Sequence, residues 1–200
     1  MYVFLLLLFP LAFWLLVRPK RLFCAGSAFF VAALVCAFRA FFMFRAPYAG
    51  SSLIVYAARS WGTFVALPMM VFVVFALFLR GALAARLAAF LSFALPFYAV
   101  YLPVEVLSAP VPFPPFMLFA KPMLYLLLLF ALSALLRRGA ALGAKKAGAV
   151  LVLAFASALL SALPAGIEAL WYYGWAPAVW GAVCAVYAVL VVIALRLSRK

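Results

Sequence analysis

Long apolar runs alternate with short groups of basic residues along the whole chain. A helix needs about 20 apolar residues to cross a hydrocarbon layer about 30 Å thick. Seven runs meet or approach that length, so the sequence predicts an all-α bundle with seven membrane-spanning helices. The predicted spans are Tyr2–Val17, Phe23–Phe44, Ser60–Leu79, Leu83–Leu102, Phe116–Leu136, Ala147–Leu170 and Ala176–Leu195.

The first run, Tyr2–Val17, is the shortest of the seven. No basic residue precedes its apolar part and no clear small-residue cleavage site follows it, so we do not expect a cleaved signal peptide. If this run lies in the membrane interface instead of crossing, the chain has six spans and both termini are cytoplasmic.

The basic residues are distributed unevenly between the two sides of the predicted bundle. Of the 16 Lys and Arg residues, twelve lie in segments 18–21, 80–86, 137–146 and 196–200. The other four are Arg39, Arg45, Arg59 and Lys121. Bases accumulate on the cytoplasmic side of membrane proteins, so the pattern predicts an external N-terminus and a cytoplasmic C-terminus. The same groups suit the anionic lipids of the cytoplasmic leaflet. Together with the short loops, the asymmetry favours a multi-pass protein of a bacterial cytoplasmic membrane.

Composition strengthens the membrane interpretation. The 200 residues are 74% hydrophobic and 9% charged, with a mean hydropathy of +1.37. Soluble domains are about 45–50% apolar and about 25% charged. We therefore expect a single integral-membrane domain over residues 1–200 with no soluble domain. The net charge of +14 would indicate nucleic acid in a soluble protein. Here topology explains the charge, and no nucleic-acid partner is expected.

The side chains available for catalysis are few. Asp, Asn, Gln and His are absent, and Glu105 and Glu168 are the only acids. This excludes an ordinary Ser-His-Asp triad and a His-based metal site. No phosphate-binding loop or dinucleotide fingerprint occurs, and the three cysteines form no CxxC pair. We expect neither enzymatic activity, nor a cofactor, nor a bound metal.

Charged and aromatic residues near the predicted outer face are the candidates for a binding site. A charge at membrane depth costs about 2.5–3.5 kcal/mol, so Arg39 is predicted to pair with Glu105 or Glu168. The tentative ligand-binding set is Arg39, Arg45, Arg59, Glu105, Glu168, Trp171 and Tyr172. The structural alternative is that Arg–Glu pairs join helices and that the aromatic run 171–175 belongs to an interfacial belt.

Three other features carry local expectations. Each outer loop contains Ala-Pro, at Pro47, Pro110 and Pro177, which favours either internal repetition of helical hairpins or the ordinary preference of proline for loops. Ser60 and Thr63 are predicted to cap the third span. Lys121 is expected to snorkel to the outer interface.

Three functions fit this sequence. The first is a transport component, a solute-binding or permease-type subunit with an outward polar pocket for a small solute. The second is a non-catalytic accessory subunit that docks on other membrane proteins. The third is a lipid-modifying enzyme using Glu105 or Glu168. Transport predicts a pocket lined by Arg39 and both acids. The accessory role predicts that these residues are paired and dry. The enzyme predicts a Glu beside a nucleophile in a cleft open to lipid.

Overall fold

The computed structural model of the chain describes residues 2–16, 22–42, 52–108, 115–142 and 146–197. Of the residues described, 93% are helical and none forms a strand, so the all-α prediction is confirmed for this part of the chain. Among these described residues, six helices are long and apolar enough to cross a membrane, and the helix near the N-terminus is shorter. The chain packs as two compact units, Met1–Gly50 with Ala89–Leu126, and Ser51–Ala88 with Leu127–Lys200.

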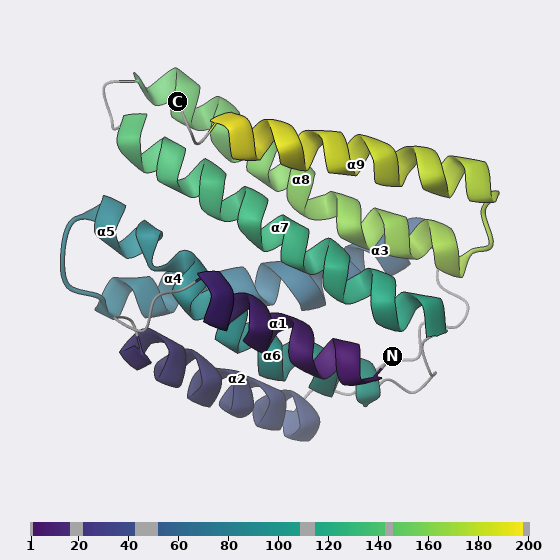
Figure 1. The fold of residues 1–200 in the computed structure, drawn as a ribbon, viewed down its shortest axis with the longest axis horizontal. Coiled ribbons are helices and arrows are strands. Elements are labelled where there is room, and N and C mark those ends of the chain that lie inside the picture. The colour runs from purple at the N-terminus through teal and green to yellow at the C-terminus, as the bar shows by residue number, and fades with distance from the viewer. Residues whose placement is uncertain (1, 17–21, 43–51, 109–114, 143–145, 198–200) are drawn as a thin grey trace. The chain divides into compact units, whose positions relative to one another are not determined.

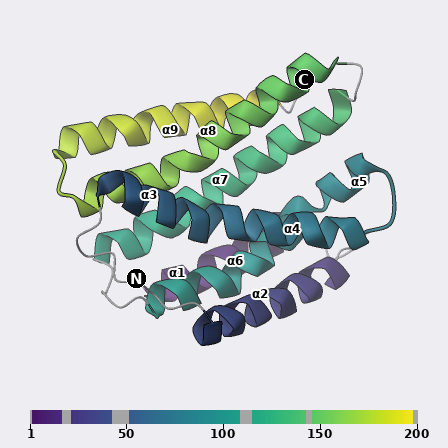
Figure 2. The ribbon, with the colours of Figure 1, turned by 180° about the vertical axis from the view of Figure 1, so that it is seen from behind.

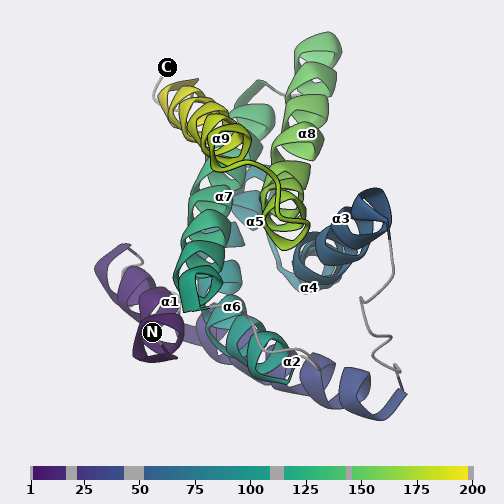
Figure 3. The same ribbon diagram turned by 90° about the vertical axis from the view of Figure 1, so that its right-hand side faces the viewer.

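The first unit, unit 1, is built around helix α6 (Phe90–Leu107). Helices α1 (Tyr2–Leu16) and α2 (Leu22–Phe42) both pack against α6 (Figure 3). The first part of α7 (Pro115–Leu142) completes the unit. Because α6 lies between the other helices of unit 1, it is largely buried. Every side chain from Ser92 to Tyr98 is buried.

Aromatic contacts hold the helices of unit 1 together. Phe9 of α1 stacks on Tyr98 of α6 with ring centroids 5.7 Å apart. Tyr98 in turn lies 6.2 Å from the ring of Tyr125 in α7. Between α1 and α7, Phe4 stacks on Phe119 with ring centroids 4.4 Å apart. Stacked aromatic rings therefore link α1, α6 and α7. Such pairs stabilise the folded state beyond the burial of their surface area.

The second unit, unit 2, contains an irregular helix near its N-terminal boundary. It comprises α3 (Leu53–Trp61), the π-helical turn η2 (Gly62–Ala66) and α4 (Leu67–Phe78), which run end to end (Figure 2). Pro68 lies in the first turn of α4 and has no N–H to donate to a carbonyl four residues earlier. The widened turn immediately before it accommodates this missing bond, as π turns do in long helices.

The prediction for the start of this helix was wrong. The helix begins at Leu53, and Ser52 is the cap, because its Oγ accepts a hydrogen bond from Val55 N at 3.4 Å. Ser60 therefore lies in the body of the helix, seven residues beyond its start. The prediction was based on uninterrupted apolar residues, and Arg59 interrupts the apolar sequence at this point. The helical residues before Arg59 were therefore left out of the predicted span.

The remaining helices of unit 2 are α5 (Leu83–Ala88), the second part of α7, α8 (Ala147–Tyr172) and α9 (Pro177–Leu197). Helix α8 packs against both α3 and α9 (Figure 1). A short connection with Gly174 at φ 66° joins α8 to α9. Glycine suits this position, because side chains rarely adopt a positive φ. The outer faces of the helices carry large apolar side chains, such as Phe78 and Phe155, which fits contact with lipid.

Candidate functional site

The two acids of the chain lie in different units, so each is described with the neighbours of its own unit. Glu105 belongs to unit 1 and Glu168 to unit 2. Both side chains are buried, with 7% and 2% of their surface exposed. Each acid lies near the C-terminal end of a helix that contains proline, Pro103 in α6 and Pro164 in α8.

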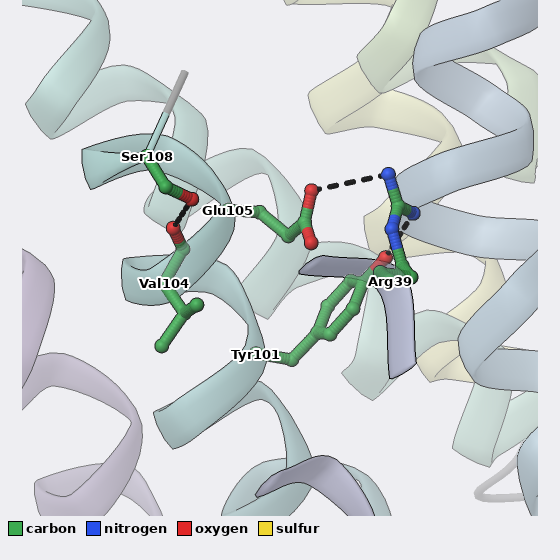
Figure 4. Close-up of polar contacts among 5 residues, drawn as sticks. All are labelled: Arg39, Tyr101, Val104, Glu105 and Ser108. Atoms are coloured by element: carbon green, nitrogen blue, oxygen red, sulfur yellow. Dashed lines mark hydrogen bonds and ion pairs between the residues drawn. The ribbon is translucent and has the colours of Figure 1, made fainter. Parts of the chain in front are cut away.

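In unit 1, the structure pairs Glu105 with Arg39, which identifies the carboxylate partner that the sequence left open. Arg39 Nη2 lies 3.2 Å from Glu105 Oε2, and Arg39 Nη1 donates a hydrogen bond to the hydroxyl of Tyr101 at 2.8 Å. Figure 4 shows the guanidinium reaching from α2 to these two side chains of α6. Tyr101 and Glu105 are four residues apart, so they lie on one face of α6 and meet Arg39 together.

The contacts of this ion pair are incomplete. Among the described residues, Arg39 Nε and Glu105 Oε1 are buried atoms without a hydrogen-bond partner. One N–O contact therefore joins the charged groups, whereas an arginine and a carboxylate can form two parallel bonds. One turn beyond the acid, Ser108 Oγ donates to the carbonyl of Val104, within the last turn of its own helix (Figure 4).

In unit 2, two hydroxyl groups of α3 donate to Glu168 of α8. Tyr56 Oη lies 2.8 Å from Glu168 Oε1, and Ser60 Oγ lies 2.9 Å from Glu168 Oε2. A third interhelical bond, from Trp61 Nε1 to Ser161 Oγ at 3.0 Å, lies along the same helix pair. We call these three contacts the polar seam between α3 and α8. Their spacing follows the helical repeat, which places polar groups along one line of each helix.

Aromatic side chains cover one end of the polar seam. The ring of Tyr56 stacks on Tyr172 with centroids 4.8 Å apart and an interplanar angle of 10°. Tyr173 meets the same ring edge-on at 6.2 Å. Trp171 instead contacts Trp180 of α9, at 5.4 Å. Tyr172, one of the two predicted aromatic residues, therefore contacts a residue that bonds directly to Glu168.

The other predicted site residues are placed as follows. Arg59 is exposed on α3 in unit 2, and Arg45 lies outside the described residues. Lys121, expected at the interface, is only 1% exposed, so the snorkelling prediction was wrong. Neighbouring residues of the protein therefore cover the Lys121 side chain.

Sequence reasoning missed Tyr56, Tyr101 and Trp61 and misassigned Ser60. Tyrosine, tryptophan and serine are common in apolar helices, and these residues lie 62 to 112 positions from their partners. The one available signal was the four-residue spacing of Tyr101 and Glu105, which predicts a shared helix face.

The distance between Ser60 and Glu168 is the one feature of the seam that fits a nucleophile beside a general base. Ser60 Oγ is within hydrogen-bond reach of Glu168, as nucleophilic catalysis requires. Both side chains are almost completely buried, with 1% of Ser60 and 2% of Glu168 exposed. Among the described residues, no group of three or more Cys and Glu side chains is close enough to hold a metal ion.

Comparison with known proteins adds no relative: no family model, no curated protein and no solved structure matches the chain.

Proposed function

We propose that the chain is a membrane transport component in which Arg39, Glu105 and Tyr101 contact a small polar solute. The supporting observation is the incomplete ion pair, in which a buried guanidinium N–H and a buried carboxylate oxygen have no hydrogen-bond partner among the described residues. Ionisable groups at membrane depth are costly and commonly mark substrate or ion pathways. An unsatisfied donor and an unsatisfied acceptor within one ion pair offer a solute two polar contacts at little further desolvation cost.

The proposed topology is seven spans with an external N-terminus and a cytoplasmic C-terminus. It includes α1 as the first span, although at about 1.5 Å per residue its 15 residues cover only about 22 Å. The distribution of the bases supports this orientation, because twelve of the sixteen fall on the side assigned to the cytoplasm. The proposed location is a bacterial cytoplasmic membrane.

A ligand screen on the purified protein tests the proposed function. Vitamins, amino acids, sugars and inorganic anions are added separately, and the melting temperature is measured. A ligand at a hundred times its dissociation constant stabilises the folded state by about 2.7 kcal/mol. We expect at least one compound to raise the melting temperature of the natural protein but not of Glu105→Gln.

Two variants control this experiment. Ser157→Ala removes only a bond to the Leu153 carbonyl of its own helix, so it should keep the ligand-induced shift. Tyr101→Phe keeps the ring and removes the hydroxyl that accepts from Arg39, so it should weaken the shift. A compound that stabilises Glu105→Gln and Arg39→Gln as much as the natural protein would show that these residues do not bind it.

A second candidate function, a non-catalytic accessory subunit of a larger membrane complex, is favoured by Glu168. Both of its oxygens accept hydroxyl groups from α3, which joins two helices and engages the carboxylate within the chain. This function predicts that the protein co-purifies with other membrane subunits in mild detergent, in fixed proportion. It also predicts that no compound in the screen shifts the melting temperature.

A further inference from the structure

One end of unit 2 concentrates the basic residues of that unit. Helix α8 runs antiparallel to α3, because Tyr56 near the start of α3 meets Glu168 near the end of α8. Helix α9 returns alongside α8 after a short turn. The C-terminal ends of α4, α7 and α9, the short helix α5 and the start of α8 lie toward the same end of the unit (Figures 1 and 2). The described bases at this end, which we call the basic end, are Arg80, Arg86, Arg137, Arg138, Lys146 and Arg196.

No carboxylate side chain of the chain can neutralise the basic end. The sequence has only two acids, and Glu105 is buried in an ion pair with Arg39 within unit 1. Glu168 lies on α8, whose first residue, Ala147, is at the basic end. Glu168 is 21 residues further along this helix, which is about 32 Å at about 1.5 Å per residue. Charges so far apart at a surface are largely screened, since the Debye length is about 8 Å at physiological ionic strength.

Two of the arginines are held in a form suited to phosphate. Arg86 Nε donates to the carbonyl of Gly81 at 3.0 Å, and Arg137 Nε donates to the carbonyl of Ser133 at 3.3 Å. These bonds use Nε, and within the described part of the chain the terminal nitrogens of both side chains make no hydrogen bond or ion pair. A guanidinium fixed at Nε presents its two terminal nitrogens as a fork, which matches the oxygens of a phosphate group.

We propose that the basic end binds the phosphate groups of anionic phospholipids in the membrane leaflet that it faces. It lies where the apolar helices end, which is the depth of lipid phosphates. The bases are needed to orient the chain during insertion, but insertion depends on charge and does not distinguish arginine from lysine. Phosphate binding by a fixed fork does distinguish them. This inference concerns unit 2 alone and stands or falls independently of the proposed solute site.

The test compares two lipids on the purified full chain in detergent. Phosphatidylglycerol and phosphatidylcholine are added at equal concentration, and the melting temperature and the number of lipids retained in native mass spectrometry are measured. We expect phosphatidylglycerol to raise the melting temperature and to be retained several-fold more than phosphatidylcholine. The difference should fall as salt is added, because screening weakens phosphate contacts.

Charge-preserving variants separate phosphate binding from net charge. The double variant Arg86→Lys with Arg137→Lys should lower phosphatidylglycerol retention several-fold. The matched control is Arg59→Lys, which changes an exposed arginine of the same unit far from the basic end and should keep the retention of the natural protein. Soluble glycerol phosphate should give no comparable stabilisation, because it lacks the acyl chains that anchor a lipid beside the helices.

Several results would overturn the proposal. If the natural protein retains the two lipids equally, the proposal is wrong, and this result does not depend on whether the variants fold. Unchanged phosphatidylglycerol retention in the double Lys variant would show that the bases act through charge alone. Equal stabilisation by glycerol phosphate would indicate a site for a soluble phosphate compound instead of a lipid.

Discussion

At the scale of single residues, the two acids differ in how their charge is accommodated. Glu105 faces a guanidinium and keeps one oxygen without a partner among the described residues, whereas Glu168 accepts a hydroxyl group at each oxygen. Their scarcity made both acids conspicuous in the sequence. Their different surroundings depend on which helices meet, and those helices are far apart in the chain.

The ion pair of Arg39 and Glu105 should show strong coupling in stability. Removing one partner leaves a buried charge uncompensated, which costs about 3–5 kcal/mol, whereas removing both leaves only apolar groups. Arg39→Leu and Glu105→Leu should therefore each lower the melting temperature in detergent more than the double variant does. Arg59→Leu, at an exposed position, controls for the loss of a positive charge. Additive losses in the double-mutant cycle would argue against a direct interaction.

At the scale of helices, the polar seam explains how α3 and α8 associate inside an apolar environment. Lipid tails are as apolar as leucine, so burial of apolar area does little to select one helix neighbour over another. Hydrogen bonds across the helix pair supply that selection. The π-helical turn follows the last seam residue of α3 directly, so Tyr56, Ser60 and Trp61 keep regular helical spacing and the irregular geometry begins after them.

Loss of a hydroxyl from the seam should destabilise the protein measurably. An interhelical hydrogen bond in lipid contributes about 0.6 kcal/mol on average and up to about 1.7 kcal/mol. Tyr56→Phe and Ser60→Ala each also leave an oxygen of Glu168 without that hydroxyl donor, which adds to the loss. The control Tyr172→Phe keeps the ring stacked on Tyr56 and should not change the melting temperature. Equal melting temperatures for Tyr56→Phe and Tyr172→Phe would mean that the seam does not stabilise the folded state.

At the scale of the whole molecule, the number of spans and their orientation remain predictions, and labelling can decide both. Within the described part of the chain, six helices have the length and hydropathy of a span, and α1 is an apolar helix that is shorter than these. Two side chains of α1, Leu5 and Phe9, are completely buried, so the helix packs within unit 1 whichever way it meets the membrane.

Single cysteines placed at Ser51 and Ala144, in a chain whose Cys24, Cys36 and Cys184 are replaced by alanine, test the orientation. In intact cells an impermeant maleimide should label Ser51→Cys and not Ala144→Cys. Epitope tags at the two ends count the spans, because seven spans place the ends on opposite sides. Labelling of Ala144→Cys from outside would reverse the topology, and two cytoplasmic tags would establish six spans.

The sequence alone determined the helical content, the approximate bounds of the helices and the distribution of the bases. In lipid, a helix satisfies its own backbone hydrogen bonds, so helix formation depends on residues near each other in the chain. Hydropathy therefore located α2, α6, α7, α8 and α9 without knowledge of any neighbour. The start of α3 was missed because Arg59 interrupts the apolar sequence, so the predicted span began at Ser60, seven residues after the helix begins.

Only the tertiary structure decided which side chains meet. Apart from α3, most of the helices carry few polar side chains, so hydropathy alone does not indicate which face turns toward a neighbour. The rotation of α2 and α6 that brings Arg39 to Glu105 and Tyr101, the approach of Tyr56 and Ser60 to Glu168, and the burial of Lys121 all follow from packing between helices distant in sequence. The cost of leaving a charge or a polar group unpaired in an apolar interior limits the possible arrangements, and packing selects one of them.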